Sequence, residues 1–599
     1  MMRKRGKRRR RNQSVHVISE FLERRFVLSA YALAVQPPIH VPPVPVHVEL
    51  HGHPVLPAPR AGDELMNPPI VYSTITPDGT TGPTGTTPAQ MRHAYAIDQV
   101  TFQSGTIIGN GSGQTIAIVD AFDDPKMLSS TDPNFLSSDL HQFDAHFGIP
   151  DPPSFQKLEP GGAPAANAGW IGEIALDVEW AHAIAPAASI DLVEALTNSN
   201  SNLNNAINYA KTITGVSVVS MSFGGSEFST EASSDSIYTT PSGHTGITFI
   251  ASSGDSGAPA EYPASSPNVL GVGGTTLSID STGNYLSESA WSGSGGGVSA
   301  YEPLPSYQTG VAGTNTKRMT PDVAFDANPN TGVPIYDSYN NGTAAPWSQI
   351  GGTSLSSPCW AGLIAIFNQG RVAAGLGTLD GRSQTLSMLY AMPSDAFHDV
   401  TTGTSTGRPR ISATAGYDLV TGLGTPIANR MAANFVSTGN IVVNGTASND
   451  SIYLQRQGNY LAEWINSATP GVGTPSQLDL LLGATSLTIH GGGANDSITL
   501  DQSNGNVLVA TNQLDDIGGS AALMMIGTTG SDTVSIDSST STNTFASSQL
   551  SFANVGALSF NDNGGSDVIT CNGPIPVTLQ IAGSDTINVN GGTVTLDFM

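Results

Sequence analysis

The feature that most constrains the fold of this 599-residue chain is a series of short, apolar, β-branched runs separated by helical segments. Runs without a polar face are typical of strands buried on both sides of a parallel sheet. Strands that alternate with helices predict an α/β domain with a doubly wound, mostly parallel sheet. The expected strands lie at 114–120, 188–193, 216–222 and 247–251, and the expected helices at 171–184 and 202–212.

The alternating pattern has clear limits. At its start, Thr87-Pro88 predicts a capped helix with proline at the first helical position. The pattern continues to about Ser437, so we assign the α/β domain to residues 87–437. Residues 36–86 are rich in proline and show no hydrophobic period, which predicts an extended linker.

Residues 438–599 have a different composition, with 13 acidic side chains and Arg456 as the single basic one. A short theme recurs there: an aspartate after Gly-rich residues and before a run of alternating apolar residues. This predicts an all-β repeat domain of the β-solenoid kind. The recurring aspartates are Asp450, Asp496, Asp532, Asp567 and Asp585, with irregular spacings of 46, 36, 35 and 18 residues.

Charge is distributed unevenly along the chain. Residues 1–25 hold 10 of the 23 Lys and Arg side chains but only two acids, and the rest of the chain carries a net charge of −33. Such an acidic body excludes nucleic acid as an expected partner. In isolation the basic tip could be a nucleic-acid arm, but it is more typical of the first part of an export leader, which we assign to residues 1–35. Residues 22–30 (LERRFVLSA) also resemble an N-terminal signature of exported bacterial proteins. No stretch is long and apolar enough to predict a transmembrane helix.

The strongest chemical signal is the octapeptide GGTSLSSP at 351–358, followed by an apolar helical run at 359–368. A Gly-Gly-Thr-Ser turn that begins a helix exposes one hydroxyl at the positive end of the helix dipole. There Ser354 could act as a nucleophile beside an oxyanion site, or simply as one of the Ser/Thr residues that cap helices.

A second signal is a pair of carboxylates, Glu173 and Asp177, in an otherwise apolar helix. Four residues apart, they share one helical face. Like charges at that spacing destabilise a helix unless a proton is shared or a site uses them. A third signal is Asp255, in a Gly-flanked turn after an apolar strand, at the edge of the sheet where α/β proteins bind ligands. An ordinary solvated helix face and an ordinary turn aspartate are the alternatives.

Taken together and in this order, these residues resemble the sedolisin family of serine-carboxyl peptidases, over residues 87–437. The resemblance implies a subtilisin-like fold, with Ser354 as nucleophile, Glu173 as general base, Asp177 orienting it and Asp255 as a protonated donor to the oxyanion. It also implies a supporting acid at Asp120 and an aromatic residue lining the substrate groove, here Phe223. No histidine of the chain is followed by Gly-Thr, as the catalytic histidine of a subtilisin would be, and His182 is interpreted as structural.

The same resemblance implies one calcium site near the end of the domain. Its ligands would be the carboxylates of Asp399 and Asp418 with the backbone carbonyls of Val400, Thr414 and Gly416. The repeats in turn resemble degenerate calcium-binding Gly-Gly-x-Gly-x-Asp repeats. Whether they bind calcium or use aspartate only in turns stays open.

The sequence therefore predicts a secreted or surface-exposed serine-type endopeptidase that hydrolyses polypeptides in acid. The repeat domain would serve for attachment to a cell surface or matrix, or as a spacer. The alternative is a catalytically silent surface adhesin that keeps the peptidase fold. Two cysteines, Cys359 and Cys571, far apart in the chain, exclude a disulfide scaffold.

Overall fold

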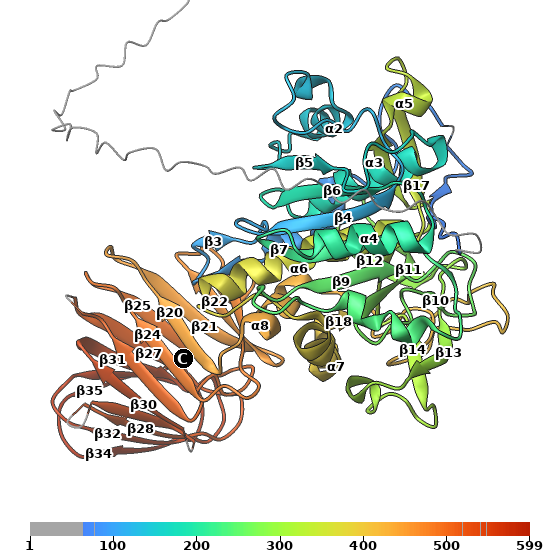
Figure 1. Ribbon diagram of the computed structural model, residues 1–599. Helices are drawn as coiled ribbons and strands as arrows, with labels where there is room; N and C mark the ends of the chain where they lie inside the picture. Colours follow the sequence, from blue (N-terminus) through green and yellow to red (C-terminus); the bar gives the residue numbers. More distant parts are fainter. Residues whose placement is uncertain (1–63, 77, 518, 539–540, 547, 599) are drawn as a thin grey trace, which may run out of the picture. The chain divides into compact units, whose positions relative to one another are not determined.

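The expected strands belong to one eight-stranded sheet in the computed structural model, which describes residues 64–598 except 77, 518, 539–540 and 547 (Figure 1). Its strand order is β12-β11-β9-β7-β4-β6-β5, with β15 paired to β11. All neighbours run parallel except β11 and β12. The bounds are β4 Thr115–Ala121, β5 Phe155–Leu158, β6 Ser189–Ala195, β7 Val216–Met221, β9 Thr248–Ser252, β11 Val269–Ile279, β12 Tyr285–Ala290 and β15 Val323–Asp326. The prediction of a mostly parallel α/β sheet is confirmed.

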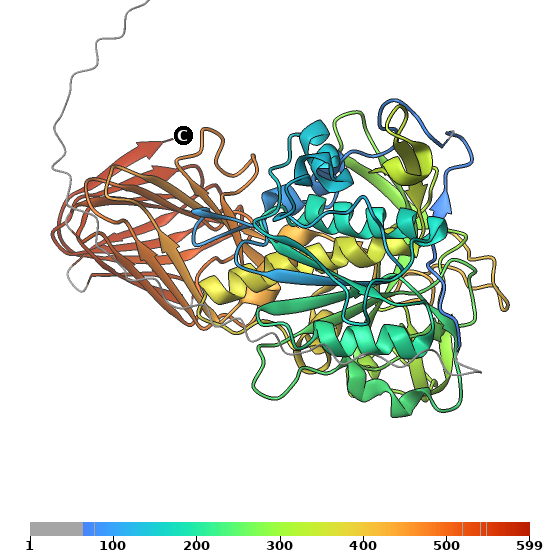
Figure 2. The same ribbon diagram turned by 45° about the horizontal axis from the view of Figure 1, so that its top comes forward.

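Helices cover both faces of this sheet. Figure 2 shows α3 (Ala168–Ile184) and α6 (Thr353–Ala373) together on one face and α4 (Asn200–Ala210) on the other. Alternate residues of β4 divide between the two layers. Ile116 and Ile118 join the apolar cluster that includes α3 and α6, and Ala117 and Val119 join the one that includes α4. Burial on both faces explains why these strands are apolar throughout.

The two helices that carry the candidate catalytic residues are buried along nearly their whole length. Every residue of α3 from Trp170 to Ile184 is buried, as is every residue of α6 from Thr353 to Arg371. A helix that is apolar all round belongs in a core. The polar groups on α3 and α6 are therefore held in fixed, dry positions, which a reactive site requires.

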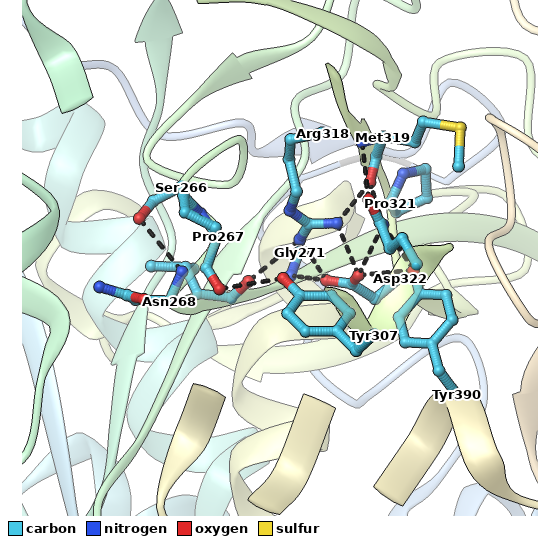
Figure 3. A network of polar contacts seen from close by, with 12 residues as sticks. Ser266, Pro267, Asn268, Gly271, Tyr307, Arg318, Met319, Pro321, Asp322 and Tyr390 are labelled. Atoms are coloured by element: carbon cyan, nitrogen blue, oxygen red, sulfur yellow. Dashed lines mark hydrogen bonds and ion pairs between the residues drawn. The ribbon is translucent and has the colours of Figure 1, made fainter. Parts of the chain in front are cut away.

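An ion pair between Arg318 and Asp322 fixes the turn before β15. Arg318 donates two hydrogen bonds to Asp322, at 2.7 and 2.6 Å, and neither side chain is exposed (Figure 3). Asp322 also accepts from the backbone N–H of Gly271 and from the Tyr390 hydroxyl. Since both carboxylate oxygens are satisfied, the pair can persist in the interior, where an unpaired charge would be strongly destabilising.

The C-terminal region forms two eight-stranded sheets, ordered β20-β24-β26-β30-β29-β28-β32-β34 and β23-β22-β21-β25-β27-β31-β33-β35. In parallel neighbours such as β21 and β25, residues of the same kind lie opposite each other, for example Ile452 opposite Ile498. The apolar side chains of both sheets form one cluster. The bounds of the first sheet are Asn440–Asn444, Ser486–His490, Thr511–Asp515, Ser548–Ala553, Thr542–Phe545, Thr533–Asp537, Val568–Asn572 and Thr586–Val589. Those of the second are Gln477–Leu480, Tyr460–Ile465, Ser451–Gln457, Ser497–Asp501, Ala521–Ile526, Val555–Asn561, Val577–Ile581 and Val594–Phe598.

The recurring aspartates of this region link successive turns of the chain. Asp496, Asp567 and Asp585 each accept a hydrogen bond from the backbone N–H of the recurring aspartate before them, at 2.8–2.9 Å. The irregular spacing has a structural reason. The 18-residue interval contains only β32 and β33, whereas the 46-residue interval also contains the antiparallel strands β22 and β23.

Two expectations concern residues at the start of the chain. The leader, 1–35, and the first part of the linker, 36–63, lie outside the described residues. Residues 64–86 are described, and within them β1 (Val71–Tyr72) pairs with β17 (Trp347–Gly351). Among the described helices, none combines the length and apolarity needed to cross a membrane.

Candidate active site

Ser354 is the second residue of α6, directly after the turn at Gly351-Gly352. Gly352 adopts φ +109°, and a Cβ added there would lie 2.0 Å from the carbonyl oxygen of Pro69 and 2.5 Å from Asp255 Oδ2. Only glycine fits this position, both for its backbone conformation and for the space beside it. The turn thus delivers the Ser354 side chain to the helix N-terminus, fully buried and without a hydrogen-bond partner among the described residues.

Pro358 explains how the motif connects to the neighbouring strand. In a regular helix the Ser354 carbonyl would accept from the N–H four residues later, which proline lacks. The Ser222 hydroxyl, just after β7, lies 3.3 Å from that carbonyl and 2.8 Å from Asp177 Oδ1. Ser222 therefore links the helix of the nucleophile to the acid pair.

The acid pair lies together with a third carboxylate. Glu173 and Asp177 project from α3, and Asp120 ends the apolar run of β4; all three are fully buried. Apart from the Ser222–Asp177 bond, their carboxylate oxygens have no hydrogen-bond partner in the described part of the chain. Such a group of acids can exist in the interior only if most of its members are protonated.

The pKa values reflect that environment. Burial raises the pKa of Asp120 to about 8. Burial, and then the charge of Asp120, raise the pKa of both Glu173 and Asp177 well above the usual range. The Ser354 hydroxyl acts in the opposite direction on Glu173, although the two make no hydrogen bond of ordinary geometry here. Glu173 is thus the acid of this group whose pKa the candidate nucleophile, Ser354, lowers.

Asp255 approaches the same helix start from the other side. It follows β9, after Gly254 with φ +100°, and its Oδ1 accepts from the backbone N–H and the hydroxyl of Thr353, at 2.8 and 2.9 Å. Its Oδ2 has no partner among the described residues. Burial raises the pKa of Asp255 well above its usual range, and the nearby Glu261 adds to this. A neutral Asp255 would therefore have its O–H on the free oxygen, beside Gly352.

Two residues that could compete for catalytic roles have other environments. His182, further along α3, lies 2.9 Å from the carbonyl of Pro150 and 3.3 Å from Asp144. Cys359, on α6, is buried and its thiol pKa is raised well above normal by burial, so it is not activated as a nucleophile.

The residues expected to bind calcium meet in one loop. Asp399 accepts from the N–H of Gly416, and Asp418 accepts from those of Thr414, Val420 and Thr421. The carbonyls of Val400, Thr414 and Gly416 receive no backbone hydrogen bond from any described residue. An all-oxygen set of two carboxylates and free carbonyls fits the preference of Ca²⁺.

Two further groups of acids lie close enough to share a cation. They are Asp123, Glu159 and Glu194 in the α/β domain, and Asp562, Asp567 and Asp585 in the repeats. In the first group the ammonium of Lys157 pairs with Asp123, so the chain itself supplies a positive charge there.

The sequence did not single out the residues whose hydrogen bonds position the candidate catalytic side chains. Thr353 positions Asp255, and Ser222 positions Asp177. Both lie within motifs, but serine and threonine are common in turns and carry no signal of such a role. Nor did the sequence indicate that residues 64–73 lie against this site.

Comparison with known proteins places the chain among peptidases. The model of the Subtilase family matches residues 113–417. Kumamolisin from Bacillus sp. (strain MN-32) is 33% identical over 385 residues, which cover 58% of this chain and 63% of that protein. Sedolisin from Pseudomonas sp. (strain 101) is 34% identical over 272 residues, covering 40% of this chain and 44% of that protein. The chain thus spans less than two thirds of these relatives.

A solved structure of Pseudomonas sedolisin, a serine-carboxyl proteinase complexed with two molecules of pseudo-iodotyrostatin, is also similar. It superposes with a TM-score of 0.50 at 28% identity, over 60% of this chain and 100% of that one.

Proposed function

Because the chain belongs to the subtilase family, with relatives among its serine-carboxyl peptidases, we propose that it is a serine-carboxyl endopeptidase acting on polypeptides. The observation that carries this proposal is the convergence of Ser354, Glu173 and Asp255 on one helix start. A nucleophile, a base and an acid able to donate to an oxyanion are the three elements that acyl transfer requires.

In the proposed reaction Glu173 takes the Ser354 proton as Oγ attacks the carbonyl carbon of the substrate. Asp177, held by Ser222, stabilises the proton on the acid pair. Asp255 donates its O–H to the developing oxyanion, a contribution worth about 10²–10³ in rate. Glu173 then protonates the leaving amine, and water releases the acyl group by the same steps.

We expect this chemistry to favour acid. Asp255 donates a hydrogen bond only while it is neutral, so activity should be lost where rising pH removes its proton. The remaining proposals follow from the sequence: action outside the cell, a calcium ion in the Asp399–Asp418 loop, and attachment of the enzyme through its repeat region. When bound, the calcium would supply structural stability to the loop.

The test is proteolysis of an acid-denatured protein at pH 3–7 by the purified chain, followed over several hours. Ser354→Ala should abolish cleavage. Ser356→Ala is the matched control, since its hydroxyl is buried and unbonded among the described residues and lies on the same helix. Cleavage that survives Ser354→Ala would refute Ser354 as the nucleophile. No cleavage by the unaltered chain at any pH would end the peptidase proposal and favour a silent binding protein.

A further inference from the structure

The segment that follows Phe223, the residue expected to line the substrate groove, packs on a separate two-stranded sheet. This segment, residues 225–238, consists of β8, η3 and η4, at Gly225–Ser226, Glu231–Ser233 and Asp235–Tyr238. The sheet consists of β13 (Gly297–Pro303) and β14 (Lys317–Thr320), and η3 contacts β13. Because the segment begins two residues after Phe223, the groups that hold it also fix one side of the candidate groove.

Four carboxyl groups lie between the segment and β13. Glu227, Glu231 and Asp235 belong to the segment, and Glu302 belongs to β13. The side chains of Glu231 and Glu302 are both 0% exposed. Glu231 is within side-chain hydrogen-bond reach of Glu227, and Glu302 of Asp235, so the acids form two pairs. A hydrogen bond between two carboxyl groups exists only while one of them carries a proton.

Few other donors reach these acids. Among the described residues, both carboxylate oxygens of Glu302 and one each of Glu227 and Glu231 are buried and receive no hydrogen bond from any other group. The second oxygens of Glu231 and Glu227 accept from the backbone N–H groups of Phe228 and Ala300, at 2.8 and 3.0 Å. The bond from Ala300 joins β13 to the segment directly. Buried oxygens without donors are destabilising when charged, which favours a shared proton in each pair.

Burial decides the protonation of these acids, because the basic side chains around them have other partners. Those partners are the Ile237 carbonyl for Lys211, the Tyr301 carbonyl for Lys317, Asp322 for Arg318 and Asn268 for Arg382. Burial raises the pKa of Glu231 to about 8 and that of Glu302 to about 7, and the charge of the paired acid raises both further. Lys317 lowers the pKa of Glu302, and Arg382 and Arg318 lower that of Asp235, but burial has the largest effect on each. The other titratable side chains nearby stay neutral because burial raises their pKa; they are Tyr238, Tyr262 and Tyr307.

We propose that the two carboxyl pairs form an acid-dependent clasp, closed while each pair shares a proton, that holds residues 225–238 against β13 beside the candidate groove. Loss of the shared protons leaves four like charges in a buried space. Because such charges repel one another and are destabilising away from water, the segment then moves off β13 until water reaches the carboxylates. The clasp itself is independent of Ser354, and only its effect on substrate binding rests on the proposed function.

The direction of the pH dependence follows from the raised pKa values. Between about pH 4.5, the ordinary pKa of glutamate, and about pH 7, the pKa of Glu302 in the closed clasp, the closed form binds more protons than the open form. The stability of the closed form is therefore fully present below this range and is lost as pH rises through it. For each proton that opening releases, the ratio of closed to open molecules falls about tenfold per pH unit.

Hydrogen exchange of the full-length Ser354→Ala chain tests the clasp without any catalysis. The amides of Phe228 and Ala300 donate to carboxylates of the clasp, and their protection relative to an unstructured peptide at the same pH should fall at least about tenfold from pH 5 to pH 7. The amide of Ile190, which donates to Ser154 at 2.9 Å, reports global unfolding and should stay more protected. Protection of Phe228 and Ala300 that is independent of pH, or equal to that of Ile190 throughout, would overturn the proposal.

Substitutions in the same Ser354→Ala chain test which protons matter. In Glu302→Gln the side-chain amide can donate to Asp235 at every pH, so the fall in protection from pH 5 to pH 7 should be at least about threefold smaller. Glu231→Gln, in the other pair, should change the fall in the same direction and serves where Glu302→Gln does not fold. Glu64→Gln, at an exposed glutamate, is the matched control and should leave the fall unchanged. An equal fall in all three variants would refute the clasp.

Peptide hydrolysis by the chain with Ser354 intact tests the consequence for the candidate groove. Between pH 5 and pH 7, KM for one peptide should rise at least about threefold more in the unaltered chain than in Glu302→Gln, while kcat changes alike in both. An equal change of KM would contradict the effect of the clasp on the groove. A chain without activity but with pH-dependent protection of Phe228 and Ala300 would end the proposed function and leave the clasp intact.

Discussion

At the scale of single residues, we expect Asp255 to decide the pH range in which the proposed reaction can occur. Its Oδ1 is fixed by Thr353, so only Oδ2 remains to carry a proton toward the oxyanion. Asparagine would keep both contacts, because its oxygen can accept from Thr353 while its amide nitrogen donates at every pH. A substitution of Asp255 by asparagine therefore keeps the hydrogen-bonding geometry of the side chain and removes its titration.

We predict that Asp255→Asn shifts the alkaline limb of the kcat/KM profile to higher pH than in the unaltered enzyme, since loss of the proton no longer removes the donor. Asp255→Ala, the control without a donor, should lose about 10²–10³ in kcat/KM across the profile. The measurement is initial rate against pH with one peptide substrate. Alkaline limbs that coincide in the unaltered enzyme and Asp255→Asn would show that another group controls that limb.

At the scale of elements, the loop that contains Asp399 and Asp418 depends on backbone N–H groups to balance two carboxylates. Asp418 is 6% exposed, and its position is fixed by Thr414, Val420 and Thr421. Asp399 is exposed, and among the described residues only Gly416 donates a hydrogen bond to it. A cation would tie these two sides of the loop together through their oxygen atoms.

Removal of calcium should therefore lower the melting temperature of the full-length chain. Binding only to the folded state stabilises it by about 2.7 kcal/mol at a hundredfold excess over Kd. Asp399→Asn keeps an acceptor for Gly416 but loses the charge, and its melting temperature should respond less to chelator. Thermal unfolding with calcium and with EGTA measures both; identical curves for the unaltered chain would argue against a calcium site in this loop.

At the scale of the whole molecule, buried acids couple folding to pH. Burial raises the pKa of Asp120, Glu173, Asp177 and Asp255. Burial also raises the pKa of Glu261, near Asp255, to about 7. No basic side chain pairs with Asp120, Glu173, Asp177 or Asp255 among the described ion pairs. Folding therefore favours the protonated form of each acid, and the folded chain binds more protons than the unfolded chain above about pH 4.

The sign of the resulting pH dependence is fixed. Between the unfolded pKa of an aspartate, about 4, and the folded pKa of Asp120, about 8, the free energy of unfolding should fall as pH rises. Each such group contributes about 1.4 kcal/mol per pH unit. Urea unfolding of Ser354→Ala, which avoids self-digestion, measures the slope, and Asp120→Asn should make it less steep. A free energy of unfolding that rises from pH 4 to pH 8 would contradict this account.

Local patterns in the sequence determined the α/β class and most of the elements that carry the site. The apolar run expected at 114–120 is β4, and the helix expected at 171–184 is α3, which starts three residues earlier. Glu173 and Asp177 share a helical face, and Ser354 begins a helix, because spacing along a helix fixes those relations within one or two turns. None of these features needs a contact with a distant residue.

Tertiary structure alone decided which distant groups meet. Asp120 joins the acid pair across 53 positions of sequence, and Ser222 joins Asp177 across 45. The sequence predicts a linker at residues 64–73. The hydrogen bonds that hold this segment to Asn198, Gly224 and β17 are mostly between backbone groups. Every residue except proline offers the same N–H and carbonyl, so strand pairing of this kind leaves no pattern of side chains from which it could be predicted.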